Sequence, residues 1–133
     1  MSVVIDASVA LALALPDEHS DWAQRLLATA LQTPARAPAL WEYEVISGLR
    51  NAERRGRMSR ADADLSLHTL LRLPVRLEQP RWTHVMTLSR QLSVSTYDAS
   101  YLEVASRLGM ALITADRALA VAATDLGVVV VGS

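Results

Sequence analysis

Short runs of consecutive apolar residues alternate with helix-like segments along the whole chain, and this pattern restricts the fold more than any other feature of the sequence. The clearest runs are residues 3–5, 111–113 and 128–131, and residues 35–37 and 75–77 are further strand candidates. A strand that is apolar on both faces is typical of a parallel sheet that helices cover on both sides. We therefore predict an α/β fold of three layers, α/β/α, around a central parallel sheet of about five strands.

The segments between these strands carry apolar residues at helical spacing, with approximate bounds 9–15, 22–30, 40–55, 60–71, 80–92, 96–108 and 116–126. Ser59, with Asp62 three residues later, resembles a capping box. Ser95 or Thr96 is the expected cap of the helix that Gly109 is placed to end. Because no repeat or linker divides the chain, residues 1–133 are predicted to form one domain.

Composition excludes several classes of site. The 133 residues include no cysteine, so a disulfide framework, a thiol nucleophile and a thiolate metal site are excluded. All 13 basic residues are arginine, which excludes a P-loop lysine and a Schiff base. The net charge of -1 neither implies nor excludes nucleic acid as a partner. The longest apolar stretch, residues 9–15, is too short to span a bilayer, so we expect a cytoplasmic protein without a signal peptide.

Two aspartates follow predicted strands directly or nearly so. Asp6 comes after residues 3–5, and Asp116 follows residues 111–113 by two positions. In an open parallel sheet, ligands bind beyond the carboxyl ends of the strands, which makes both residues candidates for a site. The alternative for each is a helix N-cap, a position that favours aspartate in any case.

Asp98 heads an apolar stripe made of Tyr101, Leu102 and Ala105, so its side chain is expected to point inward. The helix dipole stabilises a carboxylate in the first turn by only about 0.3 to 1 kcal/mol, whereas burying an unpaired charge costs several kcal/mol. An arginine or a cation is therefore expected opposite Asp98.

On the helix from residue 40, Glu42 and Glu44 lie on opposite flanks, and the helical wheel does not choose between them. The small neighbours Ser47 and Gly48 leave more room for a ligand near Glu44.

Carboxylates from such distant segments would repel one another in a shared cleft unless a divalent cation held them. A ligand set made only of oxygen suits hard ions, Mg²⁺ or Mn²⁺, which pair readily with phosphate oxygens. The residues alone thus favour metal-assisted hydrolysis of a phosphodiester.

Four short motifs follow one another along the chain at residues 4–9 (VIDASV), 43–45 (YEV), 96–102 (TYDASYL) and 112–119 (LITADRAL). In this order they resemble the PIN-domain family, and most closely its VapC-type ribonuclease toxins. The resemblance covers essentially the whole chain. It implies that Asp6, Glu44, Asp98 and Asp116 hold Mg²⁺ or Mn²⁺, with the hydroxyls of Ser8 and Thr114 supporting them. Ser47 stands where the family commonly has asparagine.

The resemblance also implies an endoribonuclease that is the toxin of a type II toxin–antitoxin module. An RNA substrate, a cognate antitoxin and a homodimer belong to that expectation. A response-regulator receiver is disfavoured, because Ser8 stands where a second acid is needed and lysine is absent. A structural α/β domain, or a catalytically inactive PIN-like module that binds RNA or protein, remains an alternative.

Side chains outside the motifs give further expectations. Arg50, Arg54 and Arg55, with Arg57 and Arg60 beyond them, are candidates for gripping an RNA backbone, and the alternative is a solvated helix end. Trp22, Trp41 and Trp82 occupy apolar helical positions and are expected in the core or a dimer contact rather than as platforms for base stacking. The predicted helix at residues 60–71 is expected to rest on its apolar residues Leu65, Leu67, Leu70 and Leu71. His19, His68 and His84 have no metal-like spacing and are expected to be structural or on the surface.

Overall fold

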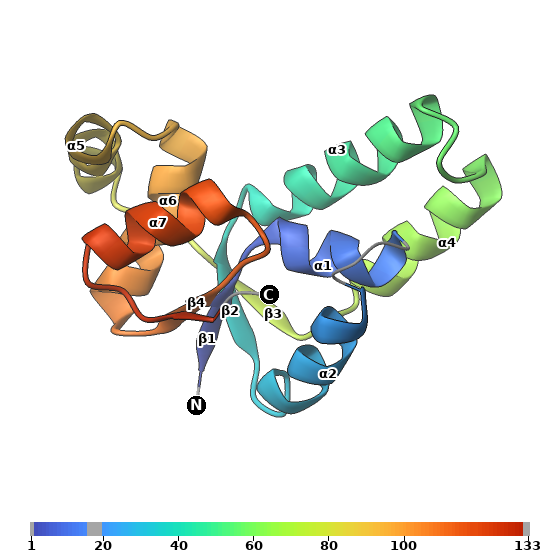
Figure 1. The fold of residues 1–133 in the computed structure, drawn as a ribbon, viewed down its shortest axis with the longest axis horizontal. Coiled ribbons are helices and arrows are strands. Elements are labelled where there is room, and N and C mark those ends of the chain that lie inside the picture. The colour runs from blue at the N-terminus through green and yellow to red at the C-terminus, as the bar shows by residue number, and fades with distance from the viewer. Residues whose placement is uncertain (1, 16–19, 132–133) are drawn as a thin grey trace.

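A computed structural model describes residues 2–15 and 20–131, and over these ranges strands and helices alternate as the sequence predicts (Figure 1). The strands are β1 (Val3–Ile5), β2 (Ala35–Pro38), β3 (Val75–Glu78), β4 (Ala111–Ile113) and β5 (Val130–Val131). The helices are α1 (Ala7–Ala14), α2 (Ser20–Ala30), α3 (Trp41–Arg54), α4 (Arg60–Leu70), α5 (Trp82–Leu92), α6 (Thr96–Leu108) and α7 (Arg117–Asp125).

The five strands form one parallel sheet in the order β3-β2-β1-β4-β5, which confirms the predicted α/β class. β1 lies at the centre, where Val4 pairs with Arg36 of β2 on one side and with Leu112 of β4 on the other. The chain runs outward from β1 to β2 and β3, then returns to the other side of β1 to form β4 and β5. The direction of strand addition therefore reverses between β1 and β4.

Helices lie on both sides of the strands. In right-handed crossovers, the direction in which strands are added decides which face of the sheet the connecting helices cover. Because this direction reverses after β3, α1 to α4 cover one face and α5 to α7 the other. α1 packs against α2, α3 and α4, while α6 packs against β1, β2 and β4. α3 and α4 lie side by side and extend beyond the sheet as a helical arm (Figure 1).

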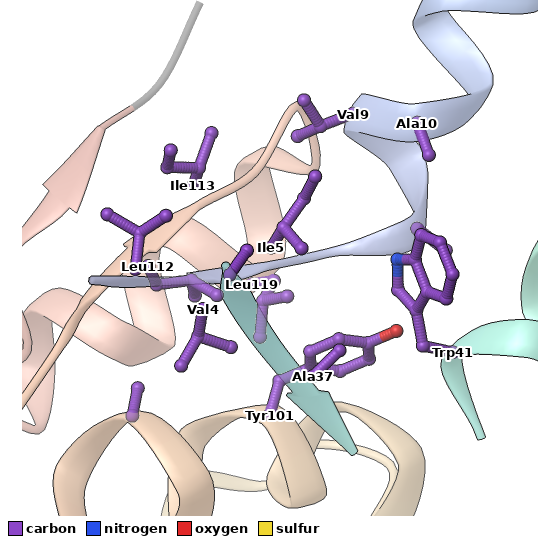
Figure 2. Packing of buried hydrophobic residues seen from close by; sticks show 14 of the residues in the cluster. Val4, Ile5, Val9, Ala10, Ala37, Trp41, Tyr101, Leu112, Ile113 and Leu119 are labelled. Carbon is purple, nitrogen blue, oxygen red and sulfur yellow. The ribbon is translucent and has the colours of Figure 1, made fainter. Parts of the chain in front are cut away.

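The core is made of the two-sided apolar strands and the helix faces that cover them. Trp41 and Tyr101 are its largest fully buried side chains, and Figure 2 shows the Tyr101 ring beside Ala37, with its hydroxyl turned toward Trp41. Complete burial of an apolar side chain of this kind stabilises the fold by about 1.5 to 3 kcal/mol. The same contacts fix where α3 and α6 begin relative to the sheet.

Local signals at helix ends are confirmed. The Ser59 hydroxyl accepts a hydrogen bond from the Asp62 N–H at 3.0 Å, and Ser95, not Thr96, caps α6 through the Asp98 N–H. Gly109 ends α6 with φ of 63°, in the left-handed region that glycine adopts without steric cost.

The structure corrects some expectations about apolar residues. Trp82 is 79% exposed on α5, a helix without buried residues, so of its two expected places the core is excluded. Leu65 of α4 is 67% exposed. The last strand is shorter than predicted, since β5 covers only Val130–Val131, although the Val129 carbonyl already accepts a hydrogen bond from the Leu112 N–H at 2.8 Å. His19, expected to be structural or on the surface, lies outside the described residues. None of the helices in the described ranges is long and apolar enough to cross a membrane.

Candidate active site

A cleft of about 580 Å³ opens where the strand order reverses, beyond the carboxyl ends of β1 and β4. Open α/β sheets bind ligands at this position, because the loops that follow the two strands diverge there. Asp6, Glu44, Asp98 and Asp116 all line the cleft. The structure therefore brings together four acids that the sequence places on four separate segments.

Asp6 is held by hydroxyl groups rather than by a helix end. It occupies the N-cap position of α1, yet its side chain makes no capping hydrogen bond. Instead, its Oδ2 accepts hydrogen bonds from Ser8 Oγ and Thr114 Oγ1, both at 2.7 Å. Asp6 is 7% exposed, so this orientation is fixed within the protein interior. Asp6 therefore stands at the N-cap position but is held mainly by these two hydroxyls.

Thr114 joins the ends of β1 and β4. Its hydroxyl donates to Asp6 and accepts from the N–H of Asp116 at 2.9 Å, while Ser8 Oγ accepts from the N–H of Ala115 at 3.0 Å. Each hydroxyl donates a hydrogen bond to the Asp6 carboxylate and accepts one from a backbone N–H. Ser8 and Thr114, which the resemblance marks as supporting residues, therefore set the geometry of both loops.

Asp116 does cap a helix. Its Oδ1 accepts hydrogen bonds from the N–H groups of Ala118 and Leu119, at 2.9 and 3.2 Å, at the start of α7. Its Oδ2 has no hydrogen-bond partner among the described residues. Asp116 thus caps α7 with one oxygen while its side chain also lines the cleft, so the two sequence interpretations of this residue are compatible.

The structure chooses between the two glutamates of α3. Glu44 lines the cleft and accepts a hydrogen bond of 2.6 Å from the Tyr101 hydroxyl, whereas Glu42 does not line it. Sequence analysis placed Tyr101 only in the apolar stripe of α6. Its hydroxyl at the edge of a buried ring is the signal that would have identified this second role, because a buried tyrosine hydroxyl usually has a hydrogen-bond partner.

Asp98 enters the cleft from the first turn of α6. The stripe behind it is buried as predicted, with Tyr101, Leu102 and Ala105 each at most 1% exposed. The Asp98 carboxylate has no hydrogen-bond partner among the described residues, and no arginine lines the cleft opposite it. Of the two neighbours that the sequence called for, an arginine is therefore excluded.

Three of the carboxyl groups have raised pKa values. Burial is the main cause for Asp6, Glu44 and Asp98, and each is raised further by at least one of the other acids of the cleft. Hydrogen bonds from Ser8 and Thr114 to Asp6, and from Tyr101 to Glu44, oppose this rise. Burial also raises the pKa of Tyr101, so its hydroxyl stays protonated and donates. The cleft thus concentrates negative charge that its own residues do not neutralise.

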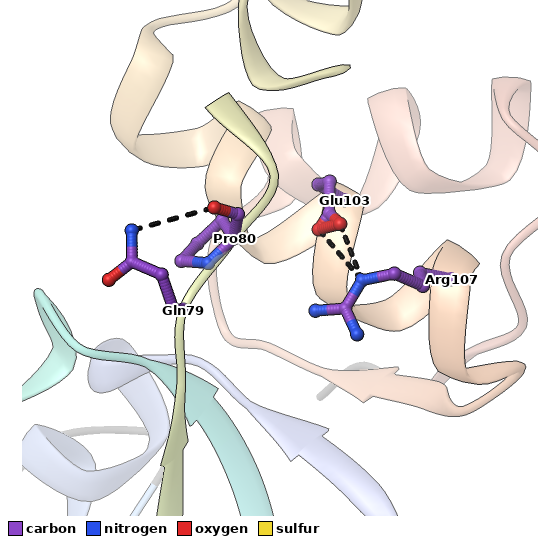
Figure 3. Close-up of polar contacts among 4 residues, drawn as sticks. All are labelled: Gln79, Pro80, Glu103 and Arg107. Atoms are coloured by element: carbon purple, nitrogen blue, oxygen red, sulfur yellow. Dashed lines mark hydrogen bonds and ion pairs between the residues drawn. The ribbon is translucent and has the colours of Figure 1, made fainter. Parts of the chain in front are cut away.

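A buried acid outside the cleft shows how this chain compensates a carboxylate elsewhere. Glu103 of α6 is 2% exposed and accepts hydrogen bonds from Arg107 Nε at 2.6 and 3.4 Å (Figure 3). The acids of the cleft have no such partner, because none of the described residues that line the cleft is basic. Glu103 is therefore a structural ion pair, and the cleft is a different kind of environment.

The donor set of the cleft fits a hard divalent cation. It offers carboxylate oxygens without histidine or cysteine, the ligand type that Mg²⁺ and Mn²⁺ prefer. Within residues 2–15 and 20–131, no three His, Cys, Asp or Glu side chains are positioned to hold a metal ion together. The argument for a cation therefore rests on the uncompensated charge and the oxygen chemistry of the cleft.

The arginines expected to contact RNA lie away from these acids. Arg50 is paired with Glu53 on α3 at 3.0 Å, and Arg54 and Arg55 are exposed at the tip of the helical arm. Sequence analysis missed three other polar or aromatic residues that line the cleft, namely Tyr43, Asn51 and Tyr97. Asn51 lies one helical turn beyond Ser47 and two beyond Glu44, so this spacing places all three on the same face of α3 and would have predicted that Asn51 lines the cleft.

Comparison with known proteins gives three findings. The PIN domain family matches residues 3–124. The chain is 37% identical to the VapC ribonuclease Mb0985 of Mycobacterium bovis over 118 aligned residues. This alignment covers 86% of this chain and 85% of that protein. PAE2754 from Pyrobaculum aerophilum has a similar structure, with a TM-score of 0.73 and 28% identity over 98% of this chain and 92% of that one.

A fourth comparison concerns the fold alone. The structure of VapBC2 from Rickettsia felis, bound to a DNA fragment from its promoter, matches with a TM-score of 0.72 at 10% identity. The match covers 99% of this chain and 98% of that one. The same arrangement of sheet and helices therefore persists where few residues are shared.

Proposed function

This chain belongs to the PIN domain family and to its VapC ribonucleases, and from that premise we propose that it is a metal-dependent endoribonuclease. One observation carries the proposal. Four carboxylates converge on a cleft at the switch point of the sheet, and no basic side chain among the described residues lines that cleft. Such a site attracts a divalent cation, and a divalent cation attracts the phosphate of a nucleic acid.

In this proposal, Asp6, Glu44, Asp98 and Asp116 hold Mg²⁺ or Mn²⁺. When bound, the ion supplies an activated water and stabilises negative charge on the phosphate oxygens. Ser8 and Thr114 keep the Asp6 carboxylate turned to the cleft, and Tyr101 does the same for Glu44. These hydroxyls preorganise the acids before RNA binds, which limits the reorganisation needed during reaction.

The biological role that we propose is that of the toxin in a type II toxin–antitoxin module. A VapC relative at 37% identity supports this role, and the likeness of fold to VapBC2 agrees with it. The proposal includes a cognate antitoxin that covers the cleft, a homodimer and a cytoplasmic location. The second candidate, an inactive module that binds RNA or protein, would leave the four acids without a chemical task.

The test is cleavage of a mixed, structured RNA by purified protein that is free of co-purifying antitoxin. We expect cleavage with Mg²⁺ or Mn²⁺, none with EDTA, and none for Asp6→Asn or Asp98→Asn. Glu44→Gln and Glu42→Gln form a matched pair, because the two residues lie on one helix but only Glu44 lines the cleft. Equal loss in both glutamine variants, or cleavage that persists in EDTA, would contradict the proposed site.

A further inference from the structure

Two exposed tyrosines stand beside the acids of the cleft. Tyr43 is 74% exposed and Tyr97 is 64% exposed, although both line the cleft that Glu44 and Asp98 line. The chain has only three tyrosines, three tryptophans and no phenylalanine, so two of its six aromatic side chains lie at this one place. Neither phenolic hydroxyl has a hydrogen-bond partner among the described residues.

Each tyrosine is fixed to the site by the helix that carries it. Tyr43 immediately precedes Glu44 in the first turn of α3, and Tyr97 immediately precedes Asp98 in the first turn of α6. Tyr101, four positions after Tyr97 on α6, donates a hydrogen bond to Glu44 of α3 and so ties the two helices together beside the cleft. The two exposed aromatic rings therefore come from two different helices that line the same cleft.

As a proposed site for RNA, the cleft has an unusual property, namely the lack of cationic side chains on its described residues. Because no described residue that lines it is basic, charge attraction from side chains cannot supply the affinity for the nucleotides that flank the reacting phosphate. Stacking of bases on aromatic rings is a neutral source of affinity that tolerates any sequence. A base inside a duplex is already stacked on both faces and is not available to a tyrosine, whereas an unpaired base is.

We propose that Tyr43 and Tyr97 stack on bases of the RNA that flank the reacting phosphate and thereby hold the strand in the cleft. This inference rests on the proposed function, since it assigns two positioning residues to the same site. The rings position RNA, and the chemistry remains with the carboxylates. Any effect of these rings should therefore appear in RNA binding and KM rather than in kcat.

The experiment measures binding by fluorescence anisotropy, with Asp98→Asn as the background so that RNA is not consumed. The three probes are a labelled mixed-sequence single strand, its duplex, and an abasic strand of the same length. We expect Tyr43→Ala and Tyr97→Ala each to weaken single-strand binding about tenfold, the scale of one stacked base. Tyr43→Phe and Tyr97→Phe should retain binding, because phenylalanine keeps the ring.

The controls separate stacking from other effects. The duplex and the abasic strand should bind more weakly than the single strand and should not respond to the alanine variants. Leu65→Ala is the matched control, because Leu65 is 67% exposed but lies on α4 and does not line the cleft. Thermal unfolding of every variant identifies any loss of folding.

The outcomes also separate this inference from the function on which it rests. Metal-dependent cleavage by wild type, with single-strand binding unchanged in the alanine variants, overturns the stacking role and leaves the nuclease intact. If RNA binding depends on the tyrosine rings but the wild-type protein never cleaves RNA, the stacking role is supported and the proposed nuclease function is contradicted. If the alanine variants instead lose self-association or antitoxin binding while RNA binding is unchanged, the tyrosines belong to a protein interface and the inference is overturned.

Discussion

The hydroxyl of Tyr101 donates a hydrogen bond of 2.6 Å to Oε1 of Glu44, across 57 positions of the chain. Tyr101→Phe removes this donor and keeps the buried ring in place. Loss of a partner that orients a metal ligand typically weakens metal affinity about 10- to 100-fold, and we expect a loss of that size. Titration with Mn²⁺ by calorimetry measures it. Tyr97→Phe, which removes an exposed hydroxyl beside the same cleft, should leave Mn²⁺ affinity unchanged.

The acids of the cleft should make the metal-free protein less stable at neutral pH. Burial, with repulsion from Asp116 and Asp6, raises the pKa of Asp98 above its ordinary value of 3.8. A carboxyl group whose pKa is higher in the folded state binds more protons there. The free energy of unfolding therefore falls as pH rises from that ordinary value through the raised pKa. We expect the Tm in EDTA to be lower at pH 7 than near pH 4 on account of these groups.

Asp98→Asn removes one of these charges and should raise the Tm in EDTA at pH 7 while abolishing cleavage. Thermal unfolding followed by circular dichroism measures the change. Asp125→Asn is the control, because Asp125 is exposed at the end of α7 and outside the cleft. An Asp98→Asn protein no more stable than wild type at pH 7 would show that the cleft does not strain the fold.

Metal should reverse the same destabilisation. A ligand that binds only the folded state at 100 times its Kd stabilises it by about 2.7 kcal/mol. For a domain of this size that corresponds to a rise in Tm of roughly 5 to 15 °C. We expect this rise with Mn²⁺ for wild type and its absence for Asp6→Asn. A similar rise in both proteins would place the ion elsewhere.

Thr114 should matter for stability as well as for the position of Asp6. Thr114→Val keeps the shape of the side chain but removes a donor to Asp6 and an acceptor for the N–H of Asp116. Leaving a buried polar group without its partner costs about 1 to 3 kcal/mol, so we expect a loss of about 2 kcal/mol in urea unfolding. Thr124→Val is the matched control, because its hydroxyl only bonds the Ala120 carbonyl on exposed α7. Equal losses would contradict a special role for Thr114.

The exposed arginines at the tip of the helical arm test a separate part of the RNA interface. Charge reversal of Arg54 and Arg55 should weaken RNA binding, and the slope of log affinity against log salt should fall by about 1 for each phosphate that the variant no longer neutralises. Arg90→Glu, on exposed α5, is the control. An unchanged salt slope would assign these arginines to a solvated helix end.

Most of the fold follows from local signals in the sequence. The runs at residues 3–5 and 111–113 are apolar on both faces because helices cover both, so the pattern alone identified central strands. Ser59 and Gly109 marked helix ends through hydrogen-bonding and backbone properties that need no tertiary contact. The exposure of Trp82 could not be predicted, for the opposite reason. Its helical spacing is correct, but whether another element covers that face depends on the whole fold.

The candidate site was partly predictable in the same sense. Asp6 and Asp116 were found because strand ends in a parallel sheet gather at one edge, a rule that needs only the strands. Glu42 and Glu44 were not separable, since the choice depends on which flank of α3 faces Tyr101. Tyr43 and Tyr97 belong to the quoted motifs, but their exposure beside the cleft was not predicted, because it is a property of the assembled surface. The capping role of Asp116 and its place in the cleft looked like rivals and are compatible.

The hydrogen bond between Asp6 and Thr114 spans 108 positions of the chain, and it has a consequence for the timing of synthesis. A ribosome that has not yet added Ala111 holds a nascent chain without β4, without Asp116 and with the central strand unpaired on one side. Such a chain cannot assemble the cleft, however well its earlier helices fold. The cleft, and any activity that it supports, can therefore form only after β4 and the loop that carries Asp116 have been synthesised.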